Sequence, residues 1–310
     1  MKPLRMGTRG SKLALWQAEH IRAKLLQEAG IESELVVIKT AGDQFASAAI
    51  PDVGGKGIFI KEIEDALLEE RVDVAVHSMK DVPTATPRGL CFPAITKRED
   101  PRDCLVSRSG HLLAELPAGA RVGTSSLRRQ SQLLCFRRDL QVANLRGNVD
   151  TRMRKLDAGE VDAIVVAKAG LDRLGLSDKI TQILPPNIML SAVGQGALAI
   201  EAREGDARTI EVLATFDDAD SRAAVNAERA LLAELEGGCQ VPLGAWARIE
   251  EERLRLDARV LSADGAESIH RRAEGSPPDG ERVGRNLARE LLDAGADRLL
   301  RLAGRSVGGG

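Results

Sequence analysis

Short apolar runs that end in polar turns and continue into amphipathic helices recur along the first part of this 310-residue chain. The first such unit runs from residues 4–7, through Thr8-Arg9-Gly10-Ser11, into a helix that Ser11 caps and Gly30 closes. A second strand is predicted at residues 34–39. Because parallel strands need a crossover connection, which is usually a helix, this order predicts an α/β fold with a parallel sheet.

The same unit is repeated further along the chain. Residues 57–70 have the apolar spacing of a helix, and the strand that follows ends in the polar run His77-Ser78-Met79-Lys80-Asp81-Val82-Pro83. Further strands are predicted at residues 72–76, 121–123, 141–145 and 161–167, and a helix at residues 153–159. Residues 40–57 lack periodicity, so we expect a long mobile loop there.

Two segments are predicted to cross between domains, at residues 97–103 and 191–201. Two crossings imply a hinged pair of lobes with a cleft between them. Beyond residue 217, three alternating runs and a helical pattern predict a third domain, a small sheet of three strands packed with helices. The strands are expected at residues 245–249, 254–261 and 268–273, and the helix at 281–293. The predicted domains are residues 1–98 with 197–216, residues 99–196, and residues 217–310.

Composition excludes several classes of protein. The 44 basic and 46 acidic side chains nearly balance, which argues against general binding to nucleic acid or to a membrane surface. The N-terminal residues lack the apolar core of a signal peptide and no apolar run is long enough to span a bilayer, so we expect a cytoplasmic protein. The cysteines and the four histidines are dispersed, so neither disulfides nor a metal site is expected. The cysteines are Cys91, Cys104, Cys135 and Cys239.

Two positions are candidates for chemistry. Cys239 lies in the glycine-flanked stretch 237–244, where a ligand can approach closely and where nearby cations would favour the nucleophilic thiolate. The alternative for Cys239 is a small buried apolar side chain. Lys80 and Asp81 follow a buried strand, and ligands of open α/β sheets bind at the carboxyl ends of strands. The alternative for this pair is an ordinary salt-bridged loop.

Six arginines are expected at strand ends or in the turns just after them. Guanidinium groups match carboxylates in a bidentate way, and helix N-termini at Ser11 and Ser125 would add N–H donors. The set predicts a cationic cleft for a ligand with several carboxylates or for a phosphate, although arginines on solvated faces are the alternative. No GxxxxGK[ST] loop is present, which argues against a nucleoside triphosphate. The arginines are Arg9, Arg128, Arg129, Arg146, Arg152 and Arg173.

Seven stretches, in order over nearly the whole chain, resemble the porphobilinogen deaminase family, also called the hydroxymethylbilane synthases. The sequences His-Ser-Met-Lys-Asp-Val-Pro and Gly-Gly-Cys-Gln-Val-Pro-Leu-Gly are highly specific to it. The resemblance implies three α/β domains, the first two arranged like the lobes of a periplasmic binding protein. The stretches are Thr8-Arg9-Gly10-Ser11, Val53-Gly54-Gly55-Lys56-Gly57, 77–83, 123–129, Leu145-Arg146-Gly147-Asn148, Gly194-Gln195-Gly196 and 237–244.

The resemblance also implies a reaction and a covalent cofactor. Cys239 would carry a dipyrromethane, made from two porphobilinogen units, through a thioether. Four further porphobilinogens would be added head to tail with loss of ammonia, and water would release the linear tetrapyrrole hydroxymethylbilane. Asp81 matches the catalytic aspartate, which would protonate the leaving ammonia and stabilise the cationic pyrrole.

The remaining site residues are carried over in the same way. Residues expected to hold the cofactor are Cys239, Asp81, Lys80, Ser126, Arg128, Arg129 and Arg146. Residues expected to bind substrate are Arg9, Ser11, Arg146, Arg152, Arg173, Gln195 and Lys56. The chain departs from many relatives at Asp52, where they carry lysine, so a contact from this loop to substrate is in doubt. The other three cysteines are assigned to packing.

The partner expected is porphobilinogen with the growing pyrrole chain, and a monomer is expected because no strong apolar stripe is present. Two rival functions stay open. A non-catalytic two-lobed anion-binding protein would need the arginines but neither Asp81 nor Cys239, and a phosphoribosyl-type transferase could use similar lobes.

Overall fold

The computed structural model describes residues 2–40, 60–235 and 241–307. The chain divides into two compact units, residues 1–99 with 196–222 and residues 100–195 with 223–310. The first unit holds one five-stranded sheet, and the second holds a five-stranded and a three-stranded sheet. The three domain ranges expected from the sequence stay predictions.

The sheet of the first unit has the strand order β2-β1-β3-β10-β4. Its members are β1 (Leu4–Thr8), β2 (Ser33–Val37), β3 (Val74–Ser78), β4 (Leu90–Ile95) and β10 (Leu198–Arg203). Strand β1 pairs in parallel with β2 and β3, so the predicted parallel sheet is confirmed. Strand β10 pairs antiparallel with both β3 and β4. It occupies part of the predicted crossing 191–201, because the small apolar residues there fill a central strand that is buried on both faces.

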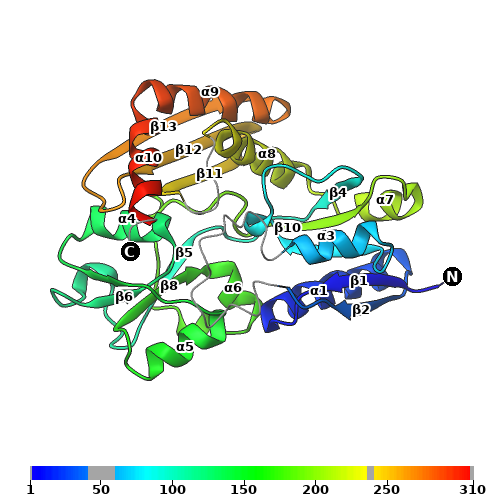
Figure 1. Cartoon of the computed structure of the whole chain (residues 1–310), viewed down its shortest axis with the longest axis horizontal. Coiled ribbons are helices and arrows are strands. Elements are labelled where there is room, and N and C mark those ends of the chain that lie inside the picture. Colours follow the sequence, from blue (N-terminus) through cyan, green and yellow to red (C-terminus); the bar gives the residue numbers. More distant parts are fainter. Residues whose placement is uncertain (1, 41–59, 236–240, 308–310) are drawn as a thin grey trace. The chain divides into compact units, whose positions relative to one another are not determined.

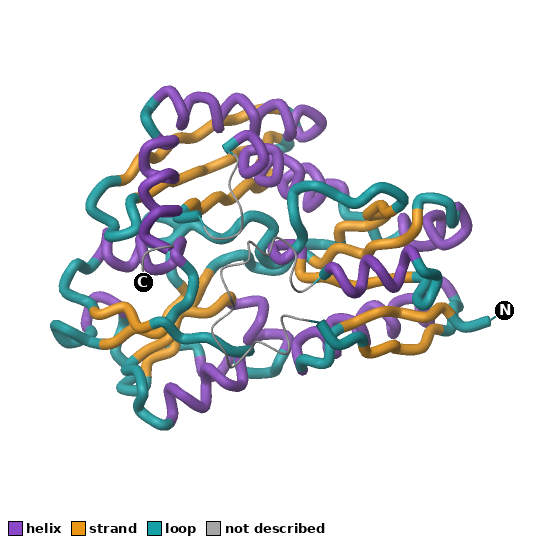
Figure 2. Tube along the Cα trace, viewed as in Figure 1, coloured by secondary structure: helices purple, strands orange, loops and turns teal. Residues whose placement is uncertain are grey.

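Helices cover both faces of this sheet (Figure 2). Helices α1 (Lys12–Ala29) and α7 (Ala207–Ala214) share one core with Val74 and Val76 of β3. Helix α3 (Lys61–Leu68) packs with Ala75 on the opposite face. The two predicted caps of α1 are confirmed. The Ser11 Oγ accepts a hydrogen bond from the Ala14 N–H at 3.3 Å, and Gly30 adopts a left-handed φ of 65°.

The five-stranded sheet of the second unit has the order β7-β6-β8-β5-β9. Its strands are β5 (Asp103–Ser107), β6 (Arg121–Gly123), β7 (Gln141–Ala143), β8 (Ala163–Ala167) and β9 (Gln182–Ile183). Strands β6, β7 and β8 are parallel, whereas β5 runs antiparallel to β8 and β9. Its helices are α4 (Leu127–Phe136), α5 (Val149–Asp157) and α6 (Lys168–Arg173).

Two helix starts in this unit differ from the expectation. Ser126, not Ser125, caps α4, since its Oγ accepts from the Arg129 N–H. Helix α5 begins at Val149 rather than at residue 153, because the Asn148 side chain accepts from the Thr151 N–H at 2.9 Å and caps the helix earlier.

The C-terminal sheet consists of β11 (Leu243–Glu250), β12 (Arg253–Leu261) and β13 (Ser268–Gly275), paired antiparallel in sequence order. Helices α8 (Ala219–Glu234), α9 (Gly280–Asp293) and α10 (Ala296–Val307) lie over one face of it (Figure 1). The predicted three-stranded sheet packed with helices is therefore confirmed. Gly284 allows α9 to approach α8, because a Cβ there would lie 2.1 Å from the carbonyl oxygen of Ala227.

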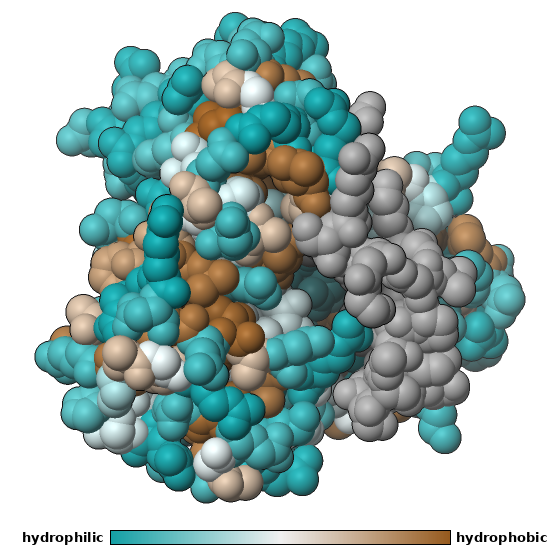
Figure 3. Space-filling model, turned by 60° about the vertical axis from the view of Figure 1, so that its left-hand side comes forward, coloured by the Kyte–Doolittle hydropathy of each residue, from teal (hydrophilic) through white to brown (hydrophobic). Residues whose placement is uncertain are grey.

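Short 3₁₀ helices complete the described elements: η1 (Met79–Asp81), η2 (Leu113–Glu115), η3 (Ser177–Lys179) and η4 (Pro277–Asp279). On the face drawn in Figure 3, hydrophilic residues predominate and hydrophobic residues show between them. Within the described part of the chain, no helix combines the length and the apolarity needed to cross a membrane.

Candidate active site

In the first unit, the carboxyl ends of β1 and β3 place four predicted site residues at one edge of the sheet. The two strands are parallel, with Met6 opposite Val74 and Gly7 opposite Ala75, so the residues after each strand emerge on the same side. Arg9 and Ser11 follow β1, and Lys80 and Asp81 follow β3. Ser11 uses its hydroxyl to cap α1, and Arg9 and Lys80 are partly buried.

The backbone around Asp81 is fixed by its neighbours. The Met79 N–H donates to the carbonyl oxygen of Ala197 at 3.0 Å, and the Val82 N–H closes the 3₁₀ turn onto Met79 at 3.1 Å. The Asp81 carboxylate is partly buried and, among the described residues, takes part in no hydrogen bond or ion pair. Both of its oxygens can therefore accept donors from a bound substrate.

Two contacts near the end of β3 involve residues that were not among the predicted site residues. The buried Gln17 amide donates to the Ser78 Oγ at 2.8 Å, which joins α1 to the end of β3. One strand residue earlier, His77 Nε2 lies 2.9 Å from Glu201 Oε2, and both side chains are buried. Burial and the charge of Glu201 also raise the pKa of the nearby Glu64. In the sequence, this contact could have been suspected from His77, which is a polar residue within the otherwise apolar strand β3.

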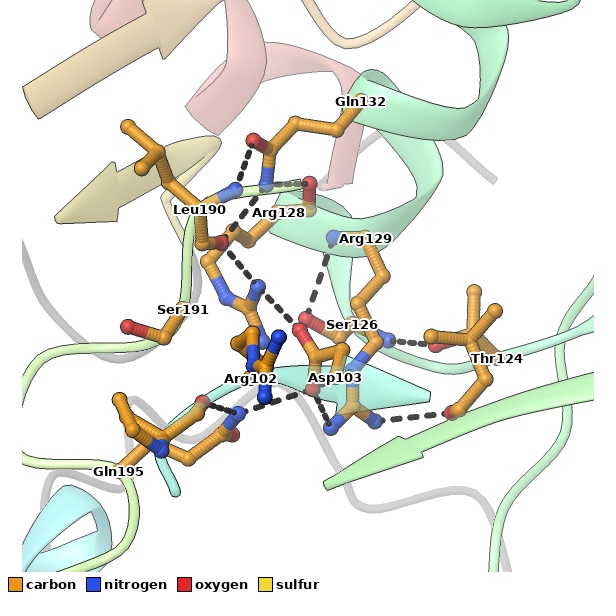
Figure 4. A network of polar contacts seen from close by, with 12 residues as sticks. Arg102, Asp103, Thr124, Ser126, Arg128, Arg129, Gln132, Leu190, Ser191 and Gln195 are labelled. Atoms are coloured by element: carbon orange, nitrogen blue, oxygen red, sulfur yellow. Dashed lines mark hydrogen bonds and ion pairs between the residues drawn. The ribbon is translucent and has the colours of Figure 1, made fainter. Parts of the chain in front are cut away.

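In the second unit, a buried aspartate gathers two of the predicted arginines. Strand β5 is antiparallel to β8, so its first residue, Asp103, lies opposite Ala167 at the carboxyl end of β8. Arg128 Nη1 donates to Asp103 Oδ2 at 2.7 Å, and Arg129 Nη2 donates to Oδ1 at 2.8 Å. Figure 4 shows both arginines reaching Asp103 from α4. Asp103 was missed because it stands in the charged run that was predicted to cross between domains.

The electrostatics of this cluster are set by burial. Asp103 is 0% exposed, and Arg128 and Arg129 hold the pKa of its carboxyl well below the usual range. Burial lowers the pKa of the Arg128 guanidinium, although Asp103 opposes that shift. Carbonyl oxygens accept further bonds, Leu190 from Arg128 at 2.6 Å and Val165 from Arg129 at 3.1 Å.

Arg152 adds a third positive charge near this cluster. Burial, reinforced by the charge of Arg129, lowers the pKa of Arg152 to about 10. Its guanidinium donates to the carbonyl oxygen of Gly147 at 2.8 Å, but no carboxylate among the described residues pairs with it. Two guanidinium groups thus pair with the carboxylate of Asp103, and Arg152 pairs with no carboxylate of a described residue, so positive charge remains for an anionic ligand to neutralise.

Other predicted residues of this unit lie in different settings. Gln195 is buried, and its amide nitrogen donates to Asp103 Oδ1 at 2.9 Å and to the carbonyl oxygen of Pro101 at 2.6 Å. Arg146 is exposed, and Arg173 is buried at the end of α6. The placement at strand ends or in the turns just after them is wrong for four of the predicted arginines, because they lie within helices: Arg128, Arg129, Arg152 and Arg173.

Cys239 and Lys56, together with Asp52, lie outside the described residues. Among the other cysteines, Cys104 is packed as expected: burial raises the pKa of its thiol to about 12, and the sulfur lies 3.5 Å from the Val166 oxygen. The assignment of Cys135 to packing is wrong, since this residue is exposed on α4. Other residues of helix α4 are buried instead.

Comparisons with known proteins identify the family to which this chain is similar. Residues 4–211 match the family model "Porphobilinogen deaminase, dipyromethane cofactor binding domain", and residues 222–293 match "Porphobilinogen deaminase, C-terminal domain". The porphobilinogen deaminase of Syntrophobacter fumaroxidans is 51% identical over 96% of each chain. That of Desulforudis audaxviator is 52% identical over 95% of this chain and 96% of its own length.

A solved structure of a periplasmic substrate-binding protein from Coxiella burnetii is 14% identical, with a TM-score of 0.41 over 69% of this chain and 91% of its own. That similarity concerns the fold alone. The sequence identities and the two family models, by contrast, cover almost the whole chain. The chain therefore belongs to the porphobilinogen deaminase family.

Proposed function

We propose that this chain deaminates porphobilinogen and joins four molecules head to tail on a dipyrromethane carried by Cys239, and then releases hydroxymethylbilane by hydrolysis. The observation that carries the proposal is that, among the described residues, Arg128 and Arg129 share the one carboxylate of Asp103 while the nearby Arg152 pairs with none. Porphobilinogen and every ring built from it carry an acetate and a propionate. A buried group of guanidiniums suits such a ligand, because paired guanidinium and carboxylate groups are stable where water is excluded.

The dipyrromethane supplies the free ring carbon to which the first substrate unit is joined. Arg128 is the best placed of the described arginines to hold its carboxylates. It uses only Nη1 for Asp103 and Leu190, so Nε and Nη2 have no hydrogen bond within the described part of the chain. Arg129, in contrast, uses all three of its nitrogens on Asp103 and Val165. We therefore assign ligand contact to Arg128 and support of the cluster to Arg129.

We assign the acid–base chemistry to Asp81. The aminomethyl nitrogen of porphobilinogen must take a proton and leave as ammonia with the electron pair of the carbon–nitrogen bond. A carboxyl group at this position can give that proton, and the resulting carboxylate can accept a hydrogen bond from the cationic pyrrole. The same carboxylate can then remove the proton from the ring carbon that forms the new bond. The Asp81 oxygens, which make no hydrogen bond or ion pair with a described residue, support this role.

The remaining assignments rest on the family. Lys80, Ser126 and Arg146 are proposed to help hold the cofactor. Residues proposed to bind incoming substrate are Arg9, Ser11, Lys56, Arg146, Arg152, Arg173 and Gln195. The Ser11 and Ser126 oxygens accept the capping hydrogen bonds of two helices, so the hydroxyl hydrogen of each serine is left to donate to a ligand carboxylate. A monomeric, cytoplasmic protein stays a prediction, which sedimentation and cell fractionation can check.

A stoichiometric assay tests the function. Purified protein incubated with porphobilinogen should release four ammonia molecules for every linear tetrapyrrole that appears in solution. The rival, a non-catalytic anion-binding protein, would bind porphobilinogen without releasing ammonia. Absence of ammonia from folded protein that retains its cofactor would contradict the proposal.

A further inference from the structure

The C-terminal sheet has a second face, opposite helices α8, α9 and α10, and this face carries charged and aromatic side chains. The core residues Ala245, Ala247 and Leu256 point toward the helices, so their neighbours along each strand point the other way. Strand register places Trp246, Asp257 and Arg272 side by side in one row across the sheet. The adjacent row contains Gly244, Arg259 and His270.

A cavity of about 350 Å³ opens on this face, and its lining residues are Trp246, Arg248, Asp257, Arg259, His270 and Arg272, together with Pro186, Asn187 and Leu190. This volume lies at the lower end of the range for small-molecule sites. All of the lining residues belong to the second unit, and none of them has a role in the proposed reaction.

The cavity has more positive than negative charge. Three of its lining residues are arginines, and Asp257 is its only carboxylate. Asp257 accepts from Arg248 Nη1 at 2.7 Å and from Arg272 Nε, so it is shared between two guanidiniums. Arg248 also pairs with Glu250 and lies 4.9 Å from the centre of the Trp246 ring, which fixes its position.

Arg259 is the arginine in this cavity with the weakest protein contacts. One of its nitrogens donates to the carbonyl oxygen of Asn187 at 3.2 Å, and it makes no ion pair with a described residue. Most of its five donors can therefore serve a ligand. Arg272 likewise keeps two terminal nitrogens beyond the Nε that bonds Asp257.

The pKa of His270, which lies opposite Arg259 in the sheet, reflects the electrostatic potential in the cavity. Burial lowers the pKa of His270, and the charge of Arg259 lowers it further, whereas Asp257 opposes the shift. Its Nε2 is buried and lies 3.4 Å from Asp257 without a hydrogen bond. Because Arg259 makes no ion pair with a described residue, an anion bound beside it and His270 would be stabilised and would favour protonation of the His270 ring.

From this geometry we infer a second anion site, in which Arg259 and Arg272 bind the phosphate or carboxylate group of a small organic acid or ester, with His270 beside it. The aliphatic and aromatic surfaces of Leu190 and Trp246 would contact the rest of the ligand. This inference does not depend on the proposed reaction.

Nuclear magnetic resonance of the intact, cofactor-loaded protein can test the site without any activity measurement. The chain has only four histidines, so the ring proton of His270 can be assigned by comparison with a His270→Gln sample. Inorganic phosphate and succinate would be titrated separately at constant ionic strength. We expect a saturable shift of the His270 signal with a dissociation constant below about 5 mM, and a raised pKa of His270 in the bound state.

Two variants, each of which removes one positive charge, distinguish binding at this site from nonspecific electrostatic attraction of anions to the protein. Arg259→Gln should weaken binding by about tenfold or more, since it removes charged hydrogen bonds to the ligand. Arg253→Gln is the control, because Arg253 lies on the same strand, pairs with Glu274 and does not line the cavity. A response to phosphate alone would identify a phosphate ester as ligand, and a response to succinate alone a carboxylate. No saturation of the His270 shift by about 10 mM of either anion, or equal weakening by both variants, would overturn the inference.

Discussion

Replacing Asp103 by asparagine tests the cluster that dominates the second unit. The change keeps the size and shape of the side chain but removes the negative charge that pairs with both Arg128 and Arg129. It also puts an amide NH₂ where a carboxylate oxygen now accepts guanidinium hydrogens. The fully buried position leaves little water to replace the lost interaction.

The expected loss of stability follows from the burial of this ion pair. Removing one partner of a buried ion pair typically costs about 3–5 kcal/mol, because the remaining charge is left uncompensated. Total stabilities of domains are about 5–15 kcal/mol, so this single substitution would remove a large part of the free energy of unfolding. At roughly 3 °C per kcal/mol for a unit of this size, the melting temperature should fall by about 10 °C or more.

Urea denaturation and calorimetry of Asp103→Asn measure this loss, with Asp100→Asn as the matched control. Asp100 pairs with Arg102 at 2.6 Å but is 22% exposed, so its loss should cost at most about 1 kcal/mol. Equal losses for the two variants, or no loss for Asp103→Asn, would refute the argument that the buried charge stabilises the unit.

The pH dependence gives a second check on the same variant. The pKa of Asp103 is depressed in the folded state, so its stabilisation is fully present above the unfolded pKa of about 4 and is lost as the pH falls further. The difference between wild type and Asp103→Asn should therefore be largest near neutral pH and should shrink in acid. A difference that stays constant through this range would show that packing, not charge, causes the loss.

Three further predictions concern the reaction and the fold. Asp81→Ala should lower kcat by about 10²–10⁴ with an unchanged melting temperature, and normal turnover would remove Asp81 from its role. Arg128→Gln should lose cofactor or raise KM and should also lower the free energy of unfolding, because Arg128 pairs with the buried Asp103, whereas Arg129→Gln should lower the free energy of unfolding and leave the cofactor in place; intact mass and denaturation separate the two. Gly284→Ala should cost about 1–3 kcal/mol because its Cβ would meet the Ala227 carbonyl, while Gly205→Ala, which has open space, should be neutral, and equal effects would contradict this packing.

Local signals in the sequence predicted much of the fold. Ser11 and Gly30 bound α1 as expected, because capping depends on residues within a few positions of each other. The parallel strands β1, β3, β6 and β8 were likewise recognisable as apolar runs that end in polar turns. The three strands of the C-terminal sheet could be read from alternation in the same way.

The pairing of segments that are distant in the chain could not be predicted from the local sequence. Strand β10 lies between β3 and β4, more than 100 residues away in the chain, and its small apolar residues resembled a crossing. Asp103 resembled a solvated residue of a charged run. Only its antiparallel register with β8 brings it beside α4, where it needs the two arginines. The family resemblance supplied Asp81 and Cys239, which composition and spacing alone left open between chemistry and ordinary packing.

The intact mass of freshly purified, folded protein tests the central claim most directly. We predict a covalent addition equal to two porphobilinogen units less the ammonia lost, confined to the peptide that contains Cys239. Brief exposure to porphobilinogen should then add further single units to the same peptide. An unmodified mass before and after porphobilinogen would contradict the account, as would an adduct on any other peptide.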